Sequence, residues 1–253
     1  MCYGTQLVLE FDEGLKQKNR KTVDRLRKLL VQDASLGQRH YASAFARPFW
    51  PVITAEHPEE AEAMQWGLVP AWVKEDPKDW LRKAPTFNAI SETAYDKPSY
   101  RGAMNNGRRC LIPVTGFFEW HHLGKLTYPH FIKVKGQEVF FLAGIYERGT
   151  YSILTCPANS LMAEVHNQKK RMPVILPVEL EETWLRAGLT KEEVLALCVP
   201  YPADGMETWT VGRGITARGQ DPNTPQASLP VEYPELAGAS WLHVGGSPAA
   251  STP

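Results

Sequence analysis

The sequence predicts a single α+β domain in which a largely antiparallel, barrel-like β-sheet is flanked by helices. Two observations favour this fold class. Residues 47–155 consist mainly of short β-branched and aromatic runs divided by Pro, Gly and Asn, whereas segments with helical spacing lie before and after them. A chain of 253 residues, 43% of them hydrophobic, can bury a core without disulfides. We therefore expect one domain over residues 1–220, followed by a Pro-rich, partly irregular tail over residues 221–253.

The elements expected first are one helix and six strands. Apolar residues at helical spacing among charged ones predict a helix over residues 14–33. Strand-like runs follow at residues 49–54, 64–69, 108–114, 128–134, 138–146 and 151–155. Because Lys-Gly-Gln around Gly136 separates the fourth and fifth runs, we expect these two strands to form a tight hairpin.

Helices dominate the expectations for the C-terminal third. Residues 158–166 are typical of a short helix, and a strand-like run follows at residues 171–176. A further helix is expected over residues 179–189, and Thr190 with Glu193 three residues later forms a capping box for the next one. The chain after Gly219 contains six prolines, which predict an irregular tail whose last ten residues are disordered.

The composition excludes several classes of protein. No apolar run approaches the roughly 18 residues that a membrane-spanning helix needs, and the N-terminus lacks the features of a signal peptide. The four cysteines are scattered without a C-x-x-C spacing, which argues against a zinc site and a disulfide framework. We therefore expect a cytoplasmic protein that uses neither a metal nor a cofactor.

The charge distribution is compatible with a local phosphate-binding face. The 28 Lys and Arg residues balance 28 Asp and Glu residues, so the whole molecule does not attract nucleic acid. Basic runs nevertheless occur at residues 16–28, 97–109 and 169–171. Any one run is typical of a solvated helix face or loop, but three in a neutral chain are consistent with phosphate binding.

Cys2 is the residue whose position is most informative. It follows Met1, and an initiator methionine is commonly removed when the next residue is small. Removal would give Cys2 a free α-amine beside its thiol, and their ordinary pKa values, about 8 and about 8.5, leave both partly nucleophilic near neutral pH. Such a 1,2-aminothiol condenses with an aldehyde to an imine, on which the thiol closes to a thiazolidine. The alternative is an incidental cysteine at a frayed terminus.

Three further polar residues have contexts compatible with catalysis. Glu119 lies between bulky aromatic residues, where a carboxyl group suits general acid or base catalysis, or it is a salt-bridged rim residue. Asn88 is either a turn-forming residue or an amide aimed at a reacting group. His166 ends a predicted helix, where a solvent-exposed histidine is the simpler interpretation.

Taken together, these segments resemble the SOS-response-associated peptidase (SRAP) family over most of residues 1–220. The order and combination of five short motifs carry the resemblance. The motifs are Met1-Cys2, Trp66-Gly67-Leu68-Val69-Pro70-Ala71-Trp72, Phe87-Asn88-Ala89 with Glu92-Thr93, Arg109-Cys110-Leu111-Ile112-Pro113 running into Gly116-Phe117-Phe118-Glu119-Trp120, and His166 followed by Arg171-Met172-Pro173-Val174-Ile175-Leu176.

The resemblance implies a protein that shields abasic sites in single-stranded DNA by covalent crosslinking, with a self-processing peptidase step that frees the cysteine. Cys2 would be the crosslinking nucleophile, and Asn88 would position its amine. Glu119 would transfer protons during imine and thiazolidine formation, while His166 would assist opening of the deoxyribose ring. Because an abasic site is in part a masked aldehyde, these roles agree with the chemistry expected of the aminothiol.

The sequence departs from the family pattern at three places. Tyr3 and Gly4 follow the cysteine where the family usually has Gly-Arg, and Ile90 stands where an Arg usually follows Asn-Ala. Residues 167–170 are extra between the histidine and Arg-Met-Pro. Two expected DNA contacts are thus missing, while the four proposed catalytic residues remain.

Binding of single-stranded DNA requires a basic groove and flat side chains on which bases stack. Trp72 is the best stacking candidate, although a buried core position is the other interpretation of this residue. The candidate phosphate contacts are Lys169, Lys170, Arg171, Arg101 and Arg109. We expect the partner to be single-stranded DNA with abasic sites, and the protein to be a monomer that associates with the nucleoid of a bacterial cell when bound to DNA.

Two other functions are compatible with the same residues. An N-terminal-nucleophile amidohydrolase, such as a glutamine amidotransferase, would use Cys2 to attack an amide carbonyl with its own amine as base. A non-enzymatic module that binds single-stranded nucleic acid would not use Cys2. Attachment to abasic DNA, ammonia release from glutamine and salt-sensitive binding alone distinguish the three functions.

Overall fold

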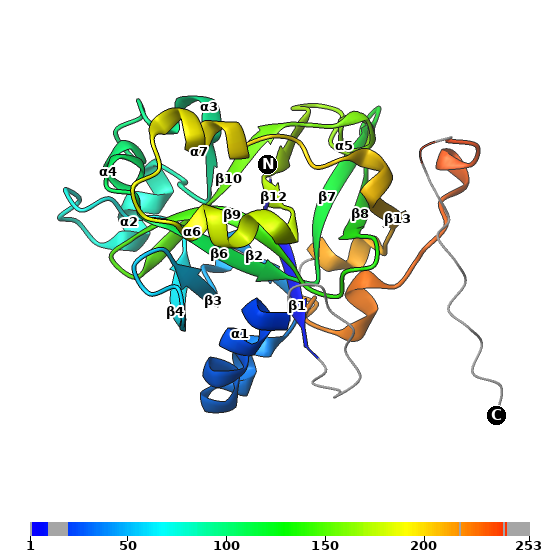
Figure 1. Cartoon of the computed structure of the whole chain (residues 1–253). Helices are drawn as coiled ribbons and strands as arrows, with labels where there is room; N and C mark the ends of the chain where they lie inside the picture. The colour runs from blue at the N-terminus through cyan, green and yellow to red at the C-terminus, as the bar shows by residue number, and fades with distance from the viewer. Residues whose placement is uncertain (1, 10–19, 218, 240, 242–253) are drawn as a thin grey trace.

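The computed structural model describes residues 2–9, 20–217, 219–239 and 241, and its strands form two sheets (Figure 1). The five-stranded sheet has the order β13-β8-β7-β1-β2, and all its neighbours are antiparallel. Its strands are β1 (Gly4–Val8), β2 (Gln38–Ser43), β7 (Gly116–Leu123), β8 (Leu126–Val134) and β13 (Met206–Thr210).

The eight-stranded sheet is partly ring-like. Its strands are β3 (Phe49–Thr54), β4 (Ala61–Trp66), β5 (Asn88–Ile90), β6 (Arg109–Val114), β9 (Phe140–Glu147), β10 (Thr150–Pro157), β11 (Arg171–Pro173) and β12 (Ile175–Leu176). β10 pairs with both β4 and β9, so the pairing runs in a cycle through β10, β4, β3, β6 and β9. The predicted α+β class with largely antiparallel strands is confirmed. The strands, however, divide between two sheets, and only one of them approaches a barrel.

Short helices surround the sheets (Figure 1). They are α1 (Arg20–Gln32), α2 (Pro77–Lys83), α3 (Ser91–Ala94), α4 (Arg101–Asn105), α5 (Ser160–Val165), α6 (Glu181–Leu185) and α7 (Lys191–Leu197). The expected helices at α1, α5, α6 and α7 are confirmed, with residues 14–19 outside the described part. The capping box is confirmed too, because the Thr190 hydroxyl accepts from the Glu193 amide while the Glu193 carboxylate accepts from the Thr190 amide.

The hairpin expected around Gly136 is wrong. Gly136 does adopt a left-handed φ of 67°, but β8 belongs to the five-stranded sheet and β9 to the eight-stranded one. Every residue of β9 is buried, so this strand needs neighbours on both sides, which β6, β10 and β12 provide. The hairpins instead join β7 to β8 and β9 to β10 at turns containing Gly124 and Gly149. Gly136 thus allows the chain to turn between the two strands, but the burial of β9 determines which strands it pairs with.

The segment after β13 covers one face of the five-stranded sheet. A small apolar cluster forms there, consisting of Tyr41, Phe118, Phe131, Val211, Ile215 and Ala227. Arg213 lies between the rings of Tyr128 and Tyr233, with centroid distances of 4.6 and 4.9 Å. The described part of the segment after residue 220 contains two short 3₁₀ helices, Pro225–Ser228 and Pro234–Leu236, and packs on the sheet. The last ten residues lie outside the described part.

Two kinds of feature, membrane-spanning helices and metal sites, are not found among the described residues. None of their helices is long and apolar enough to cross a membrane. Within the same ranges, no group of three or more His, Cys, Asp or Glu side chains is arranged to hold a metal ion. All four cysteines are buried and free.

Candidate active site

Cys2 is held immediately before β1, where the chain enters the five-stranded sheet. Gly4 pairs with Phe118 on β7. A Cβ atom at Gly4 would lie 2.9 Å from Cε2 of Tyr41 and 3.3 Å from Cβ of Phe118, so a larger residue would collide with both side chains. This close passage brings Cys2 into the interior, where its side chain is fully buried.

Asn88 fixes the main chain of Cys2 from the other sheet. Its Nδ2 donates to the carbonyl of Cys2 at 2.7 Å, while the Cys2 thiol donates to the Gly4 carbonyl at 3.4 Å. Asn88 begins β5, which pairs in parallel with β10, and its own carbonyl accepts from the Tyr100 hydroxyl at 2.9 Å. Its Oδ1 is buried and has no hydrogen-bond partner among the described residues. One acceptor beside Cys2 is therefore available.

Glu119 and His166 form a buried acid–imidazole pair. Glu119 lies on β7 and is 2% exposed, whereas His166 caps the C-terminus of α5 and is 8% exposed. Nε2 of His166 lies 4.0 Å from Oε2 of Glu119. Nδ1 of His166 lies 2.9 Å from the Arg171 carbonyl, and because a carbonyl only accepts, this contact assigns the proton of the neutral ring to Nδ1. Nε2 then presents its lone pair on the side of Glu119.

The environment of Cys2 keeps its thiol protonated. Burial raises the pKa of the thiol, and the negative charge of Glu119 raises it further. A thiol with a raised pKa contributes little thiolate near neutral pH, so it reacts only when a neighbouring base takes its proton. The arrangement therefore places a buried thiol, a carboxylate and a side-chain amide together.

A family model described as SOS response associated peptidase (SRAP) matches residues 1–217. This match spans well over half of the chain. The chain belongs to the SRAP family.

Curated relatives and solved structures agree with this assignment. The abasic site processing protein YoqW of Bacillus subtilis (strain 168) is 33% identical over 224 residues, which cover 83% of this SRAP chain and 92% of YoqW. The abasic site processing protein HMCES of Gallus gallus is 30% identical over 199 residues, covering 67% of this chain and 57% of that protein. A crystal structure of a protein from Bacteroides thetaiotaomicron matches with a TM-score of 0.79 at 30% identity, covering 91% of this chain and 100% of that chain.

Residues 167–170 of this SRAP chain, between His166 and Arg171, form a turn. Lys170 has a left-handed φ of 49°, and its amide donates to the His166 carbonyl at 2.9 Å. The side chain of Asn167 accepts from the His122 amide at 3.0 Å and donates to the His122 carbonyl at 2.8 Å. The turn thus returns the chain to Arg171 and leaves His166 beside Glu119.

Four of the predicted DNA contacts are exposed. Trp72 is 56% exposed, and its indole packs edge-on against Trp80 with a centroid distance of 5.0 Å. Arg101, at the start of α4, lies close in sequence to Pro98, whose carbonyl accepts from the Trp72 indole at 3.3 Å. Lys169 and Lys170 are exposed on the turn after α5. The expectation of a buried core position for Trp72 is therefore wrong.

Two other predicted DNA contacts need correction. Arg109 is 2% exposed, and its guanidinium donates to the carbonyls of Trp184 and Arg186, so it stabilises the end of α6. The Arg171 side chain is 15% exposed and binds the Glu92 carboxylate through two hydrogen bonds of 2.6 and 2.8 Å. Both guanidinium groups are engaged within the protein, which removes these residues from the set of phosphate contacts.

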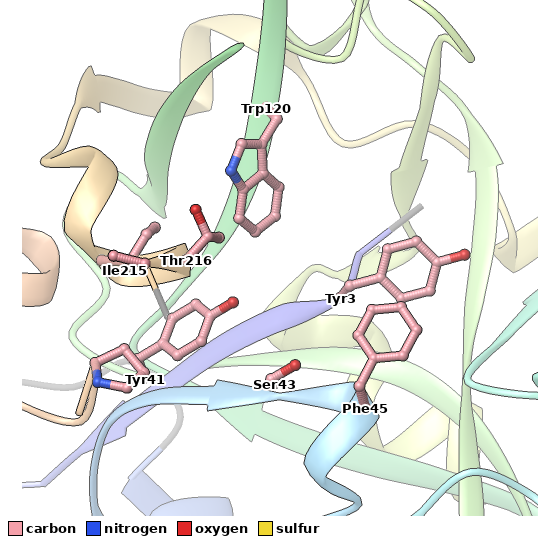
Figure 2. A pocket seen from close by; sticks show the side chains of 9 residues that line it. Tyr3, Tyr41, Ser43, Phe45, Trp120, Ile215 and Thr216 are labelled. Carbon is pink, nitrogen blue, oxygen red and sulfur yellow. The ribbon is translucent and has the colours of Figure 1, made fainter. Parts of the chain in front are cut away.

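An aromatic pocket beside Cys2 was not anticipated from the sequence (Figure 2). Its volume is about 470 Å³. The residues that line this flanking pocket are Tyr3, Tyr41, Ser43, Phe45, Trp120, Ile215, Thr216, Ala217 and Pro222. These residues come from segments far apart in the chain. The sequence hinted at the pocket only through two aromatic residues that directly follow candidate catalytic residues: Tyr3 follows Cys2, and Trp120 follows Glu119.

Proposed function

We propose that this protein forms a covalent crosslink with abasic sites in single-stranded DNA through Cys2 once Met1 has been removed. The observation that carries the proposal is the gathering of Asn88, Glu119 and His166 around a buried N-terminal cysteine. Its SRAP membership supports the same function, because relatives such as YoqW are named abasic site processing proteins.

The crosslink forms in two steps, a condensation and a ring closure. The α-amine of Cys2 attacks the C1′ aldehyde of the open abasic sugar, and loss of one water gives the imine. The thiol sulfur then bonds to the imine carbon while the thiol proton passes to the nitrogen, which closes the thiazolidine. Glu119 takes and returns protons in both steps, since a positioned carboxyl group serves as acid and base in turn.

His166 acts before the condensation. A closed abasic sugar is a hemiacetal, and its opening requires the C1′ hydroxyl to lose a proton and the ring oxygen to gain one. Nε2 of His166 accepts the hydroxyl proton, because Nδ1 is committed to the Arg171 carbonyl. The C1′–O4′ bond then breaks, its electron pair goes to O4′, which takes a proton from water, and C1′ becomes the aldehyde carbon.

Asn88 orients the amine. Its Nδ2 already holds the Cys2 carbonyl, and its Oδ1 is free to accept one hydrogen from the α-amine that removal of Met1 creates. Nδ2 and Oδ1 of Asn88 then both form hydrogen bonds with Cys2, which directs the lone pair of the α-amine nitrogen at the aldehyde. The same site supports the self-processing step, in which the Met1–Cys2 peptide bond is hydrolysed by one water.

Strand binding uses the exposed candidates. Trp72 stacks on a base, while Arg101, Lys169 and Lys170 contact phosphates. The formally neutral chain then depends on local charge, and we expect a monomer that associates with nucleoid DNA only when it is bound at a damaged site.

Denaturing electrophoresis after incubation with an abasic oligonucleotide tests this function. We expect an adduct with the abasic strand and none with intact DNA, and intact mass should show a chain that begins at Cys2. An adduct undiminished by Cys2→Ala, or a chain that retains Met1, would contradict the thiazolidine mechanism. Ammonia release from glutamine would indicate the amidohydrolase instead, and salt-sensitive binding without an adduct would indicate a binding module.

A further inference from the structure

We propose that the flanking pocket binds the nucleobase adjacent to the abasic sugar. This inference rests on the crosslinking function proposed above and extends it from the reacting sugar to its neighbour in the strand. The argument has three parts: where the pocket lies, what shape its walls impose, and which chemical groups its lining accepts.

The pocket lies beside the reactive residue. Tyr3 is bonded directly to Cys2, so one wall of the pocket begins one residue from the proposed nucleophile. Trp120 follows Glu119 on β7, and because successive strand residues face opposite sides, its ring lies on the face of the strand that carries Phe118. Tyr41 packs against the chain two residues after Cys2, since its Cε2 would lie only 2.9 Å from a Cβ atom at Gly4. A nucleotide attached to the abasic sugar therefore has the pocket within its immediate reach.

The walls are flat and aromatic. The ring of Tyr3 stacks on Phe45 with a centroid distance of 5.2 Å and an interplanar angle of 27°. Phe87 packs edge-on against both rings, at 6.4 and 5.4 Å, and holds this pair in place. Trp120 stands across the pocket from it (Figure 2). Two facing aromatic walls suit a planar ligand, and every nucleobase presents such a face.

The lining selects an uncharged ligand. None of the nine lining residues carries a formal charge, so a phosphate would find no cation there. The hydroxyl groups of Tyr41, Ser43 and Thr216 nevertheless supply donors and acceptors, and those of Tyr41 and Ser43 lie at the base of the pocket (Figure 2). A base offers hydrogen-bonding edges around an apolar face, which matches this combination better than a purely apolar group does.

Fluorescence of 2-aminopurine, an adenine analogue that stacking quenches, provides the test. The probes are single strands carrying tetrahydrofuran, an abasic analogue without an aldehyde, with 2-aminopurine on its 5′ side or its 3′ side. The full chain carries Cys2→Ala so that no covalent step contributes. We expect quenching at one of the two positions, and this result identifies which neighbour enters the pocket.

Variants connect the signal to the pocket. Tyr3→Ala and Trp120→Ala should each abolish the quenching and weaken binding about 5- to 100-fold, the range for loss of one base–aromatic stack. On a strand whose neighbouring base is also replaced by tetrahydrofuran, they should have little effect. Trp120→Phe keeps a ring and should retain most of the signal. Phe49→Ala removes a ring that is 54% exposed and outside the pocket, so it should leave both readouts unchanged.

The outcomes separate this inference from the crosslinking function. Absence of quenching at both positions, or equal loss of affinity with and without the neighbouring base, would overturn the base-binding pocket even if adducts form normally. Quenching that needs Tyr3 and Trp120 would support the pocket even if the unaltered Cys2 gave no adduct. A melting curve for each variant shows that it is folded.

Discussion

In the proposed crosslinking reaction, the thiol of Cys2 gains its reactivity from its neighbours and not from exposure. It is fully buried, and burial raises its pKa, so the thiolate is scarce near neutral pH. The same burial would exclude water from the proposed imine and favour ring closure over hydrolysis. Proton transfer in this proposal is assigned to Glu119 and His166, whose side chains lie 4.0 Å apart.

Substitution at these two positions should separate ring opening from condensation. Glu119→Gln keeps the size of the side chain but cannot transfer protons, so it should slow adduct formation about 10²- to 10⁴-fold with any aldehyde. His166→Ala should be similarly slow with a closed abasic site and partly rescued by an open-chain aldehyde. Single-turnover rates on both substrates measure the effects. If the open-chain aldehyde did not rescue His166→Ala, the assignment of ring opening to His166 and of condensation to Glu119 would be contradicted.

The Glu92–Arg171 pair should shape stability in acid. Hydrogen bonds from Arg171 lower the pKa of Glu92 to about 2, below its ordinary value of 4.5. A carboxyl group with a lowered folded-state pKa stabilises the fold above pH 4.5, and this contribution is lost as the pH falls toward 2. Glu92→Gln should therefore be less stable at neutral pH, and its melting temperature should converge with that of the wild type between these two values.

The size of this difference is limited by solvent, because the Glu92 side chain is 47% exposed. Melting temperatures of both proteins, measured at half-unit intervals of pH, test the argument. A gap that stays constant down to pH 2 would mean that Glu92 contributes through packing and not through its charge.

At the level of elements, the sequence predicted features whose signals lie within a few residues, and it missed the pairing of strands that are far apart in the chain. The strand at β3 and the capping box of α7 were found because their signals lie within a few residues. The hairpin around Gly136 was wrong because pairing depends on burial in two different sheets. β1 and β2 were not predicted, although β1 carries the catalytic terminus into place.

The candidate site shows the same limit of sequence-based prediction. The chemistry and motif context of Cys2, Asn88, Glu119 and His166 predicted a common site, and the structure places Asn88 against Cys2 and His166 against Glu119. Arg109 was predicted to contact DNA because a sequence does not show that its guanidinium donates hydrogen bonds to two backbone carbonyls 75 and 77 residues away. The flanking pocket was missed for a related reason, since its walls come from residues near 3, 43, 120 and 216.

The turn after α5 offers an electrostatic test of strand binding. Lys169 and Lys170 are exposed on it, and each released counterion contributes about 0.7 to the salt slope for single strands. Lys169→Gln with Lys170→Gln should therefore weaken binding and reduce the slope of log K against log salt by about 1.4. Binding isotherms at four salt concentrations measure this. Gln168→Ala on the same turn, an exposed position where no charge is removed, is the control, and an unchanged slope in the double variant would exclude the turn from the interface.

At the scale of the whole molecule, the active site lies where the two sheets meet. Glu119 and the strand that follows Cys2 belong to the five-stranded sheet, Asn88 belongs to the eight-stranded one, and His166 comes from α5. Any element that fixes the five-stranded sheet therefore also fixes the nucleophile. The segment after residue 220 is such an element, since Asn223 accepts from the amides of His40 and Tyr41 on β2.

Removal of residues 221–253 should consequently destabilise the fold. It exposes the site of Leu236, whose burial is worth about 2 kcal/mol, and it deletes the hydrogen bonds of Asn223 and Ser228, worth about 1 kcal/mol each. For a domain of this size, such a loss of about 4 kcal/mol lowers the melting temperature by about 8–16 °C.

Two leucines of the same segment supply matched controls for the truncation. Leu236→Ala, at a position 6% exposed, should reproduce part of the loss, whereas Leu229→Ala, at a position 54% exposed, should change little. Adduct formation should slow in the truncated chain at temperatures where it remains folded, because Pro222 lines the pocket beside Cys2 and Asn223 holds the strand that carries Tyr41. A truncated chain with unchanged melting temperature and adduct rate would show that the segment only rests on the sheet.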